Sequence, residues 1–359
     1  MKKLDTMPAR HPINATLELT LRCNLNCKMC MFRHSDCENA SLAAKELTAS
    51  QWAEMAQQMY DAGTLNILIT GGEPLLRQDF CEIYTQIYRL GFLVTLYTNA
   101  TLVTEEILQT LRQYPPHQIG ITLYGASNQT YEILCGDRCG FDRAMSGARA
   151  LATLPSVLEF RVTPVKENYQ EIDAIEEMVK REFGVPVTHA SAVFQSVRGG
   201  CMKVTDHRLN PEQMVDLTLN RTLKRIQDLL PEEYKQRVQL CLKEAKPECD
   251  KISGYTLLGC NGGMNDVTIT YDGRLLGCQM LESFSTDAVK NGFLQAWEEW
   301  PYTVRLPEID PECAACSNQH FCSICPAVRM AECGNLQGHP EYTCQITNCL
   351  IKRKGRDLL

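Results

Sequence analysis

Six short apolar runs alternate with amphipathic stretches between residues 16 and 194, and this alternation constrains the fold more than any other feature. The runs cover residues 16–21, 66–70, 92–97, 119–124, 158–164 and 187–194. Two stretches between runs place apolar side chains on one helical face: Trp52, Met55, Ala56, Met59 and Tyr60 in the first, and Ile172, Ile175, Met178 and Val179 in the second. Strands alternating with helices predict an α/β fold with a parallel sheet, wound by right-handed crossovers into an open barrel or a doubly wound sheet.

The second half of the chain differs from the first in its cysteine content and in its apolar periodicity. Residues 211–245 are predicted to form a helix, because Asn210 suits a cap and Pro211 suits the first turn. Ten of the nineteen cysteines lie after this helix, the first of them Cys249, and apolar periodicity fades there. Asp272-Gly273 between apolar stretches predicts a hairpin. Metal binding, rather than a hydrophobic core, is expected to order much of this segment.

Composition narrows the function classes. A length of 359 residues suits about two domains. The net charge of −7 argues against a nucleic-acid or anionic-membrane surface. No apolar run approaches the ~20 residues that span a bilayer, and the first residues lack the apolar core of a secretion signal, so we expect a cytoplasmic protein. In that reducing compartment, nineteen cysteines indicate metal binding, most simply iron–sulfur, rather than disulfides.

Three cysteines follow the first apolar run directly, at Cys23, Cys27 and Cys30. The spacing C-x₃-C-x₂-C at the carboxyl end of a strand suits three corners of a cubane cluster, with one iron left open for another ligand. A structural zinc loop or a cluster of buried cysteines is the alternative interpretation. The position favours chemistry, because α/β folds place their reactive groups at the carboxyl ends of strands.

This loop resembles that of the radical S-adenosylmethionine (SAM) superfamily, and so does the sequence Gly71-Gly72-Glu73-Pro74 after the second run. The resemblance implies a partial (β/α)6 barrel, a SAM-binding [4Fe–4S] cluster on Cys23, Cys27 and Cys30, and a site for the methionyl amino group at the glycine-rich turn. Glycines allow close backbone approach to a ligand, and a carboxylate accepts from an ammonium. The cofactor contacts that the resemblance implies involve Met29, Gly71, Gly72, Glu73, Pro74, Thr98, Asn99, Ser127 and Arg161. For Thr98, Asn99, Ser127 and Arg161, an ordinary turn or strand position is the alternative.

The cysteine-rich segment resembles the SPASM domain, a small α+β domain that carries two auxiliary [4Fe–4S] clusters. The resemblance implies that Cys260, Cys278 and Cys325 hold the nearer cluster, and that Cys313, Cys316, Cys322 and Cys344 hold the farther one. Two residues separate Cys322 from Cys325 where the family usually has three, which leaves this partition open. A pair of zinc ribbons is the alternative.

The remaining cysteines are Cys37, Cys81, Cys135, Cys139, Cys201, Cys241, Cys249, Cys333 and Cys349. Most are expected to be buried apolar residues. Cys241 and Cys249, between the two domains, are candidate hydrogen-atom donors in catalysis. Cys241, Cys249 or Cys333 is also a candidate fourth ligand of the nearer cluster.

The expected organisation is a tail (1–15), the radical SAM partial barrel (16–210), a helical connector (211–253), the SPASM domain (254–349) and a C-terminal tail (350–359). The resemblance implies reductive cleavage of SAM to a 5′-deoxyadenosyl radical that abstracts hydrogen from a ribosomally made peptide, leading to a crosslink, a thioether or another oxidation. The alternatives are oxidation or epimerisation of a sugar, alcohol or amino acid, and a non-catalytic iron–sulfur electron carrier.

Two protein partners are expected. About fifteen residues precede the first run, so either a peptide leader would be recognised by a separate protein or the substrate is small. Flavodoxin or ferredoxin is the expected electron donor. Neither nucleic acid nor a membrane is expected as a partner.

Overall fold

The computed structural model describes residues 9–190, 192–198, 203–229 and 256–354. They form an open sheet of nine strands in the order β6-β5-β4-β3-β2-β1-β7-β8-β9. The strands are β1 Asn14–Glu18, β2 Asn66–Thr70, β3 Leu93–Thr98, β4 Gln118–Leu123, β5 Val157–Val162, β6 Val187–His189, β7 Asp266–Ile269, β8 Arg274–Leu276 and β9 Ser285–Asp287. The first six run parallel to one another in chain order, so successive βα units add neighbouring strands.

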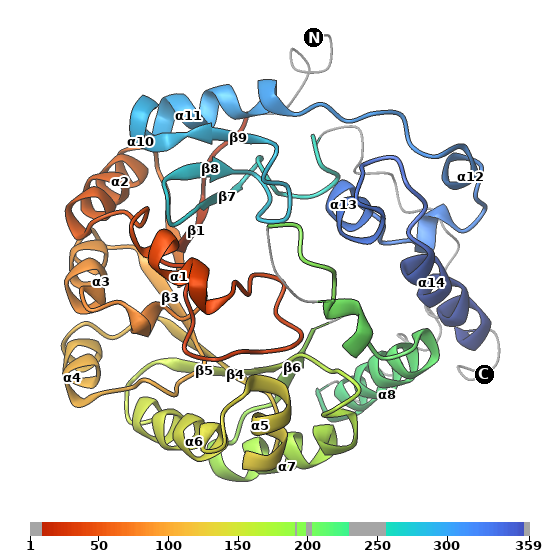
Figure 1. The fold of residues 1–359 in the computed structure, drawn as a ribbon, viewed down its shortest axis with the longest axis horizontal. Coiled ribbons are helices and arrows are strands. Elements are labelled where there is room, and N and C mark those ends of the chain that lie inside the picture. The colour runs from red at the N-terminus through yellow and green to blue at the C-terminus, as the bar shows by residue number, and fades with distance from the viewer. Residues whose placement is uncertain (1–8, 191, 199–202, 230–255, 355–359) are drawn as a thin grey trace.

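Most helices surround the curved sheet on its outer side, and Figure 1 shows these as a ring around the strands, whereas α1 lies inside the ring. The helices between the parallel strands are α1 Asp36–Ala43, α2 Ala49–Asp61, α3 Phe80–Arg89, α4 Glu105–Gln113, α5 Asn128–Cys135, α6 Gly140–Leu151 and α7 Ile172–Phe183. After β6 come α8 Pro211–Leu229, α10 Ala288–Asn291, α11 Phe293–Glu299, α12 Pro311–Ala314, α13 Pro326–Cys333 and α14 Glu341–Lys354. No helix in the described part of the chain is long and apolar enough to cross a membrane.

Alternation along the first strand explains how the sheet has two different faces. Successive side chains of a strand point to opposite sides. Leu17 and Leu19 are fully buried in the apolar core that includes Trp52 of α2. Glu18 and Thr20 point to the opposite side and are also buried. The sheet therefore packs its apolar face on the helices and turns polar side chains toward the concave side.

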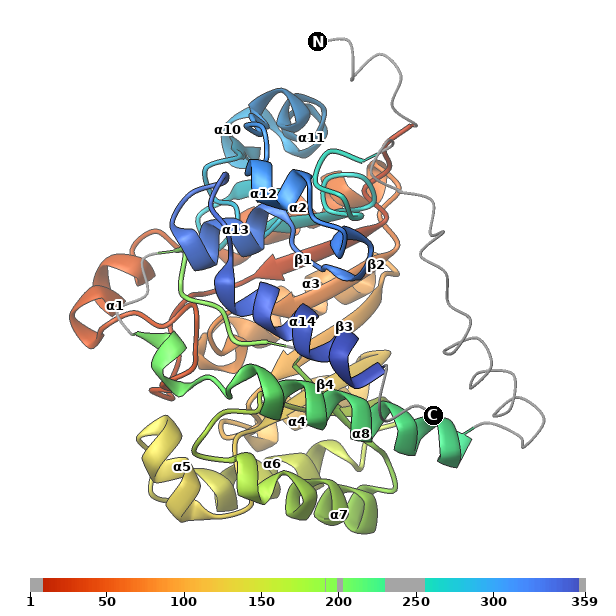
Figure 2. The same cartoon turned by 90° about the vertical axis from the view of Figure 1, so that its right-hand side faces the viewer.

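The sheet continues into the cysteine-rich segment. β7 pairs parallel with β1, with Leu17 opposite Ile269, and β8 and β9 add antiparallel strands. The hairpin predicted at Asp272-Gly273 is present, since Gly273 adopts φ +84° between β7 and β8. Farther along, α14 lies beside α8 (Figure 2). Arg353 of α14 pairs with Asp216 of α8 at 2.7 Å.

The α/β class and the open parallel barrel are confirmed, and the first six strands overlap the predicted runs. The last run, 187–194, gives a strand of three residues only. Tyr60 was placed on the buried face of its helix, but the structure leaves it 52% exposed at the end of α2. The predicted helix over 211–245 is described as far as Leu229.

Candidate active site

The three cysteines of the loop follow the carboxyl end of β1, and their thiols interact electrostatically. Cys27 is buried, and Cys23 and Cys30 are partly buried. Burial and the neighbouring thiols raise the pKa of Cys30 to about 12, and burial raises the pKa of Cys23 as well. Three sulfurs gathered in a desolvated place favour a bound cation, which deprotonates coordinating thiols. The donor set fits an iron–sulfur cluster.

The end of α5 holds the middle of this loop. The amide N–H of Asn26 donates to the carbonyl of Cys135 at 2.8 Å, and that of Lys28 donates to Leu134 at 2.9 Å. These bonds flank Cys27 on both sides, so the last turn of α5 fixes the direction of its side chain. The free carbonyls at a helix end are natural partners for such amides.

The side chains of Cys135 and Tyr124 interact with the Cys27 thiol: Cys135 and burial raise its pKa, and Tyr124 acts to lower it. Cys135 is 1% exposed. Tyr124 packs edge-on against Tyr131 with ring centroids 5.7 Å apart. The sequence predicts Cys135 to be a buried apolar residue and assigns no role to Tyr124. The contact arises because the end of α5 and the end of β4 meet the cysteine loop, which no spacing within the loop reveals.

The turn after β2 passes extremely close to the end of β1. A Cβ atom on Gly71, at φ +148°, would lie 2.2 Å from the carbonyl oxygen of Thr20. A Cβ atom on Gly72 would lie 2.3 Å from the carbonyl oxygen of Arg22, the residue before Cys23. Backbone bonds from Gly72 to Thr20 and from Glu73 to Arg22 seal this approach. The two glycines are therefore required for the backbone of the turn to contact the cysteine loop.

Glu73 is fully buried and ties the turn to the end of β3. Its Oε1 accepts from the Leu75 amide at 3.0 Å and from Thr98 Oγ1 at 2.8 Å, and its Oε2 accepts from the Asn99 amide at 2.7 Å. Burial raises the pKa of Glu73 to about 7 despite these bonds. Because a carboxylate offers about four acceptor positions, Oε2 keeps one for an ammonium.

The other residues named from sequence occupy varied places. Thr98 and Asn99 lie at this junction, and the side-chain nitrogen Nδ2 of Asn99 donates to the Cys23 sulfur at 3.9 Å. Met29 is buried in the main core. Ser127 caps α5 by accepting from the Thr130 amide at 3.2 Å. Arg161 lies 4.5 Å from the ring centre of Tyr97, its guanidinium over the ring.

Pro74 begins the short 3₁₀ turn that follows Glu73, where it is buried.

Cysteines of the cysteine-rich segment interact electrostatically with one another in two groups. The thiols of Cys260 and Cys325 act electrostatically on Cys278, whose pKa rises to about 11 mainly through burial. Burial raises the pKa of Cys344. Electrostatic interactions with three other thiols raise it further, namely those of Cys322, Cys316 and Cys313.

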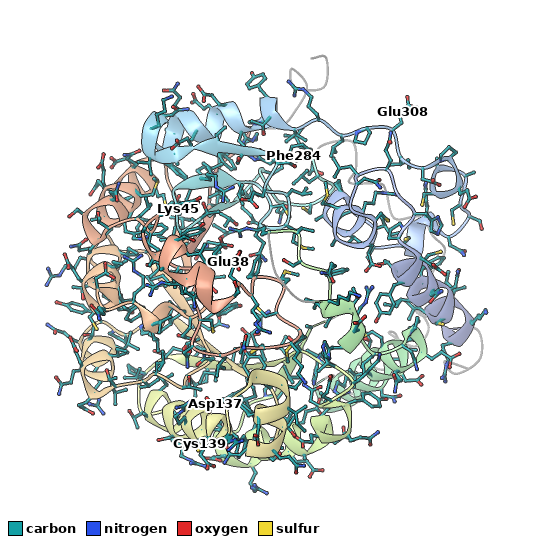
Figure 3. The ribbon with its side chains drawn as sticks, viewed as in Figure 1. Glu38, Lys45, Asp137, Cys139, Phe284 and Glu308 are labelled. Carbon is teal, nitrogen blue, oxygen red and sulfur yellow. The ribbon has the colours of Figure 1, made fainter. Side chains whose placement is uncertain are left out.

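Several remaining cysteines can also be placed. Cys241, Cys249 and Cys201 lie outside the described residues. Cys333 interacts electrostatically with Cys313 of the second set. Cys139 is exposed at the turn between α5 and α6, next to Asp137 (Figure 3).

Comparisons with known proteins agree with this arrangement. The family description "Radical SAM superfamily" matches residues 17–179. The AdoMet-dependent heme synthase of Methanosarcina barkeri (strain Fusaro / DSM 804) is 26% identical over 333 residues, which cover 90% of this chain and 94% of that protein. The PqqA peptide cyclase of Rhizobium meliloti (strain 1021) is 26% identical over 289 residues, covering 80% and 72%.

Among solved structures, Streptococcus suis SuiB bound to the precursor peptide SuiA shares this fold. Its TM-score is 0.70 at 17% identity, with 96% of this chain and 78% of that chain covered. The site and fold together define an α/β enzyme with a cysteine loop on an open parallel sheet. Residues 17–179 form a radical SAM domain. A domain of this family implies one [4Fe–4S] cluster and SAM as cofactors.

Proposed function

We propose that this chain is a radical SAM enzyme with a SPASM-type auxiliary domain that modifies a ribosomally made peptide. The observation that carries the proposal is the junction of the three-cysteine loop with the Gly71–Glu73 turn at neighbouring strand ends. Cys23, Cys27 and Cys30 would hold the SAM-binding cluster, and Glu73 would accept from the methionyl ammonium. When bound, these cofactors supply a 5′-deoxyadenosyl radical able to abstract hydrogen from carbon.

The chain's own residues position this chemistry and shield it. Gly71 and Gly72 bring the backbone of the turn against the loop, and Glu73 fixes the turn on Thr98 and Asn99. Ser127 and Arg161 are proposed to contact SAM from the ends of β4 and β5. Burial around Cys27 keeps water away, which protects reactive intermediates.

The two cysteine sets beyond β7 are proposed to hold auxiliary clusters, with Cys260, Cys278 and Cys325 in one and Cys313, Cys316, Cys322 and Cys344 in the other. Such clusters offer a route for a second electron, which suits a net oxidation such as a crosslink or thioether. Reconstitution is expected to load about twelve iron atoms per chain. Replacing Cys316 and Cys322 by alanine should remove about four, whereas Cys81→Ala on α3 should remove none.

Peptide modification is favoured by two relatives whose names specify peptides, the PqqA peptide cyclase and SuiB with its precursor SuiA. A tetrapyrrole or another small molecule is the second candidate. It is favoured by the heme synthase, which aligns with 90% of this chain and 94% of its own length. A flavodoxin or ferredoxin is proposed as the electron donor.

Deuterium transfer tests the substrate class even while the substrate itself is unidentified. Perdeuterated cell extract is separated by ultrafiltration into a peptide fraction and a small-molecule fraction. Each is incubated anaerobically with the reconstituted enzyme, SAM and dithionite. We expect 5′-deoxyadenosine to gain deuterium from the peptide fraction. Deuterium gained solely from the small-molecule fraction would contradict peptide modification, and an absence of 5′-deoxyadenosine would contradict the enzyme assignment itself.

A further inference from the structure

A buried ion pair crosses the concave side of the sheet, between Arg198 and Glu18. Arg198 follows β6, and Glu18 lies on β1, the strand that leads to the cysteine loop. Their side chains are 1% and 3% exposed. The guanidinium Nη1 donates to both carboxylate oxygens, at 2.7 and 2.8 Å. Glu18 is therefore satisfied by one nitrogen of the guanidinium.

The other edge of the guanidinium lacks acceptors. Nε and Nη2 of Arg198 are both buried, and neither has a hydrogen-bond partner among the described residues. These two N–H groups project side by side from one edge of a planar fork. Leaving buried donors unpaired costs free energy, so an acceptor is expected at this edge when the protein works.

The unpaired edge lies beside the proposed radical site. The guanidinium carbon of Arg198 is 5.3 Å from the ring centre of Phe32, two residues after Cys30. Glu18 also interacts electrostatically with Asp272 and Arg274 at the β7–β8 hairpin. The Arg198 side chain thus lies near β1, the cysteine loop and the hairpin, where Tyr271 also interacts with it electrostatically, and these belong to the two parts of the chain expected to flank a substrate.

Charge decides which acceptor fits. Glu18 already balances Arg198. Arg274 pairs with Asp272 at 3.1 Å and also with Glu282. A further carboxylate would add negative charge to a buried place where the cations are already paired, and this is unfavourable. A neutral carbonyl oxygen, with two lone pairs, satisfies both N–H groups and adds no charge.

We propose that the Nε/Nη2 edge of Arg198 binds an amide carbonyl oxygen of the substrate next to the cysteine loop. The inference deepens the proposed function and rests on it for the location of the radical chemistry. Arg198 acts here as a substrate-binding residue, and Glu18 holds its guanidinium in place.

The test compares Arg198→Lys with the wild type in the deuterium-transfer assay. Lysine keeps a cation for Glu18 but lacks the paired-donor edge. We expect the concentration of perdeuterated peptide fraction that gives half-maximal transfer to rise at least about tenfold. SAM affinity by calorimetry and iron content should stay within about twofold of wild type, because the cofactor contacts are intact.

Arg208→Lys is the matched control. Arg208 also pairs with a buried glutamate, Glu332, and also lies over an aromatic ring, that of Tyr342 at 4.0 Å. It should leave the half-maximal concentration unchanged. Should Arg198→Lys fail to load iron, Glu18→Gln with Arg198→Gln removes both buried charges together and is expected to give the same rise.

Three results would overturn the inference. One is an unchanged half-maximal concentration in the Arg198 variants. Another is a fall in SAM affinity by the same factor, which would assign the edge to the cofactor's carboxylate. The third comes from methyl-esterified peptides: if esterification abolishes the effect of Arg198→Lys, the acceptor is a substrate carboxylate. If deuterium comes from the small-molecule fraction instead, the proposal of peptide modification fails. The Arg198 inference is then tested in the small-molecule fraction, again by the half-maximal concentration for Arg198→Lys and wild type.

Discussion

The guanidinium of Arg22 forms a two-pronged ion pair with Glu46, in which Nε and Nη2 each lie 2.8 Å from a different carboxylate oxygen. Arg22 is the residue immediately before Cys23. Glu46 also accepts from Thr20 Oγ1 and lies 3.5 Å from Arg77 Nη1. Arg77 in turn donates to the Leu19 carbonyl at 2.9 Å. This network anchors the entrance of the cysteine loop to the segment before α2.

Replacing Glu46 by glutamine should therefore loosen the loop. The Glu46 side chain is 7% exposed, and breaking a buried pair leaves an uncompensated charge. We expect a loss of about 3 kcal/mol in the free energy of unfolding, measured by urea denaturation of the metal-free protein, and a lower iron content after reconstitution.

Glu105→Gln is the control, because its pair with Arg112 is about half exposed and is expected to contribute less than about 1 kcal/mol. Equal effects of the two variants would show that the Arg22–Glu46 pair does not anchor the loop.

The sequence predicted the loop but not its anchor, for a physical reason. The apolar periodicity and the three-cysteine spacing are local patterns, and the carboxyl end of a parallel strand is a shared location, so Cys23, Cys27 and Cys30 could be placed from sequence alone. Glu46 lies more than twenty residues away in a turn with no periodic signal, and only the paths of α1 and α2 bring it to Arg22.

Gly71→Ala tests the close approach between the turn and the loop. Both Gly71 and Gly91 adopt positive φ, at 148° and 92°, but only Gly71 would place a Cβ atom against a backbone oxygen. Gly91→Ala should cost about 1–2 kcal/mol from the backbone conformation alone. Gly71→Ala should cost more and also weaken SAM binding, because the turn must move away from Thr20.

Urea denaturation and calorimetry measure the two effects for the alanine variants of Gly71 and Gly91. If Gly71→Ala behaves like Gly91→Ala in both measurements, the contact with Thr20 is dispensable and the glycine is required for its backbone angle alone.

The raised pKa of Glu73, about 7, predicts two pH dependences of opposite sign. In the metal-free protein the folded state holds this proton up to about pH 7, while the unfolded chain releases it near pH 4.5. Between pH 4.5 and about 7 the unfolded state therefore binds fewer protons than the folded state. The free energy of unfolding falls by roughly 3 kcal/mol as the pH rises through this range. SAM binding needs the carboxylate, so its affinity should rise with pH up to about 7.

Calorimetric titration with SAM from pH 6 to 8 measures how the affinity depends on pH. Below the Glu73 pKa, we expect the affinity to rise with pH at about the slope of one proton released on binding. Glu73→Gln should bind SAM roughly ten- to a hundredfold more weakly, because a charge-assisted bond is lost, and without this pH dependence. A Glu73→Gln variant with the same slope as wild type would assign the titration to another group.

Contacts between site residues on different elements could not be predicted from the sequence. Glu73 was identified because its motif is contiguous, yet its burial and its bonds to Thr98 and Asn99 follow from the pairing of β2 with β3. Arg198 carries no motif at all. Its role emerges only when the segment after β6 is placed against Glu18 on β1.

The interaction of the Tyr124 side chain with the Cys27 thiol, which acts to lower the thiol pKa, gives the last prediction. Hydrogen bonds to cluster sulfurs stabilise the reduced, more negative state and raise the reduction potential. Tyr124→Phe removes one donor with little change in volume. The midpoint potential of the SAM-binding cluster should therefore fall by roughly 20–60 mV, the one-electron equivalent of ~0.5–1.5 kcal/mol.

EPR-monitored redox titration of the protein measures this shift. Tyr84→Phe serves as the control, since its hydroxyl donates to the Tyr114 carbonyl at 2.6 Å, on α3 and away from the cysteine loop. It should cost stability without moving the potential. A potential that is equal in Tyr124→Phe and wild type, with full iron content in both, would show that the hydroxyl does not bond the sulfur once Cys27 is a cluster ligand.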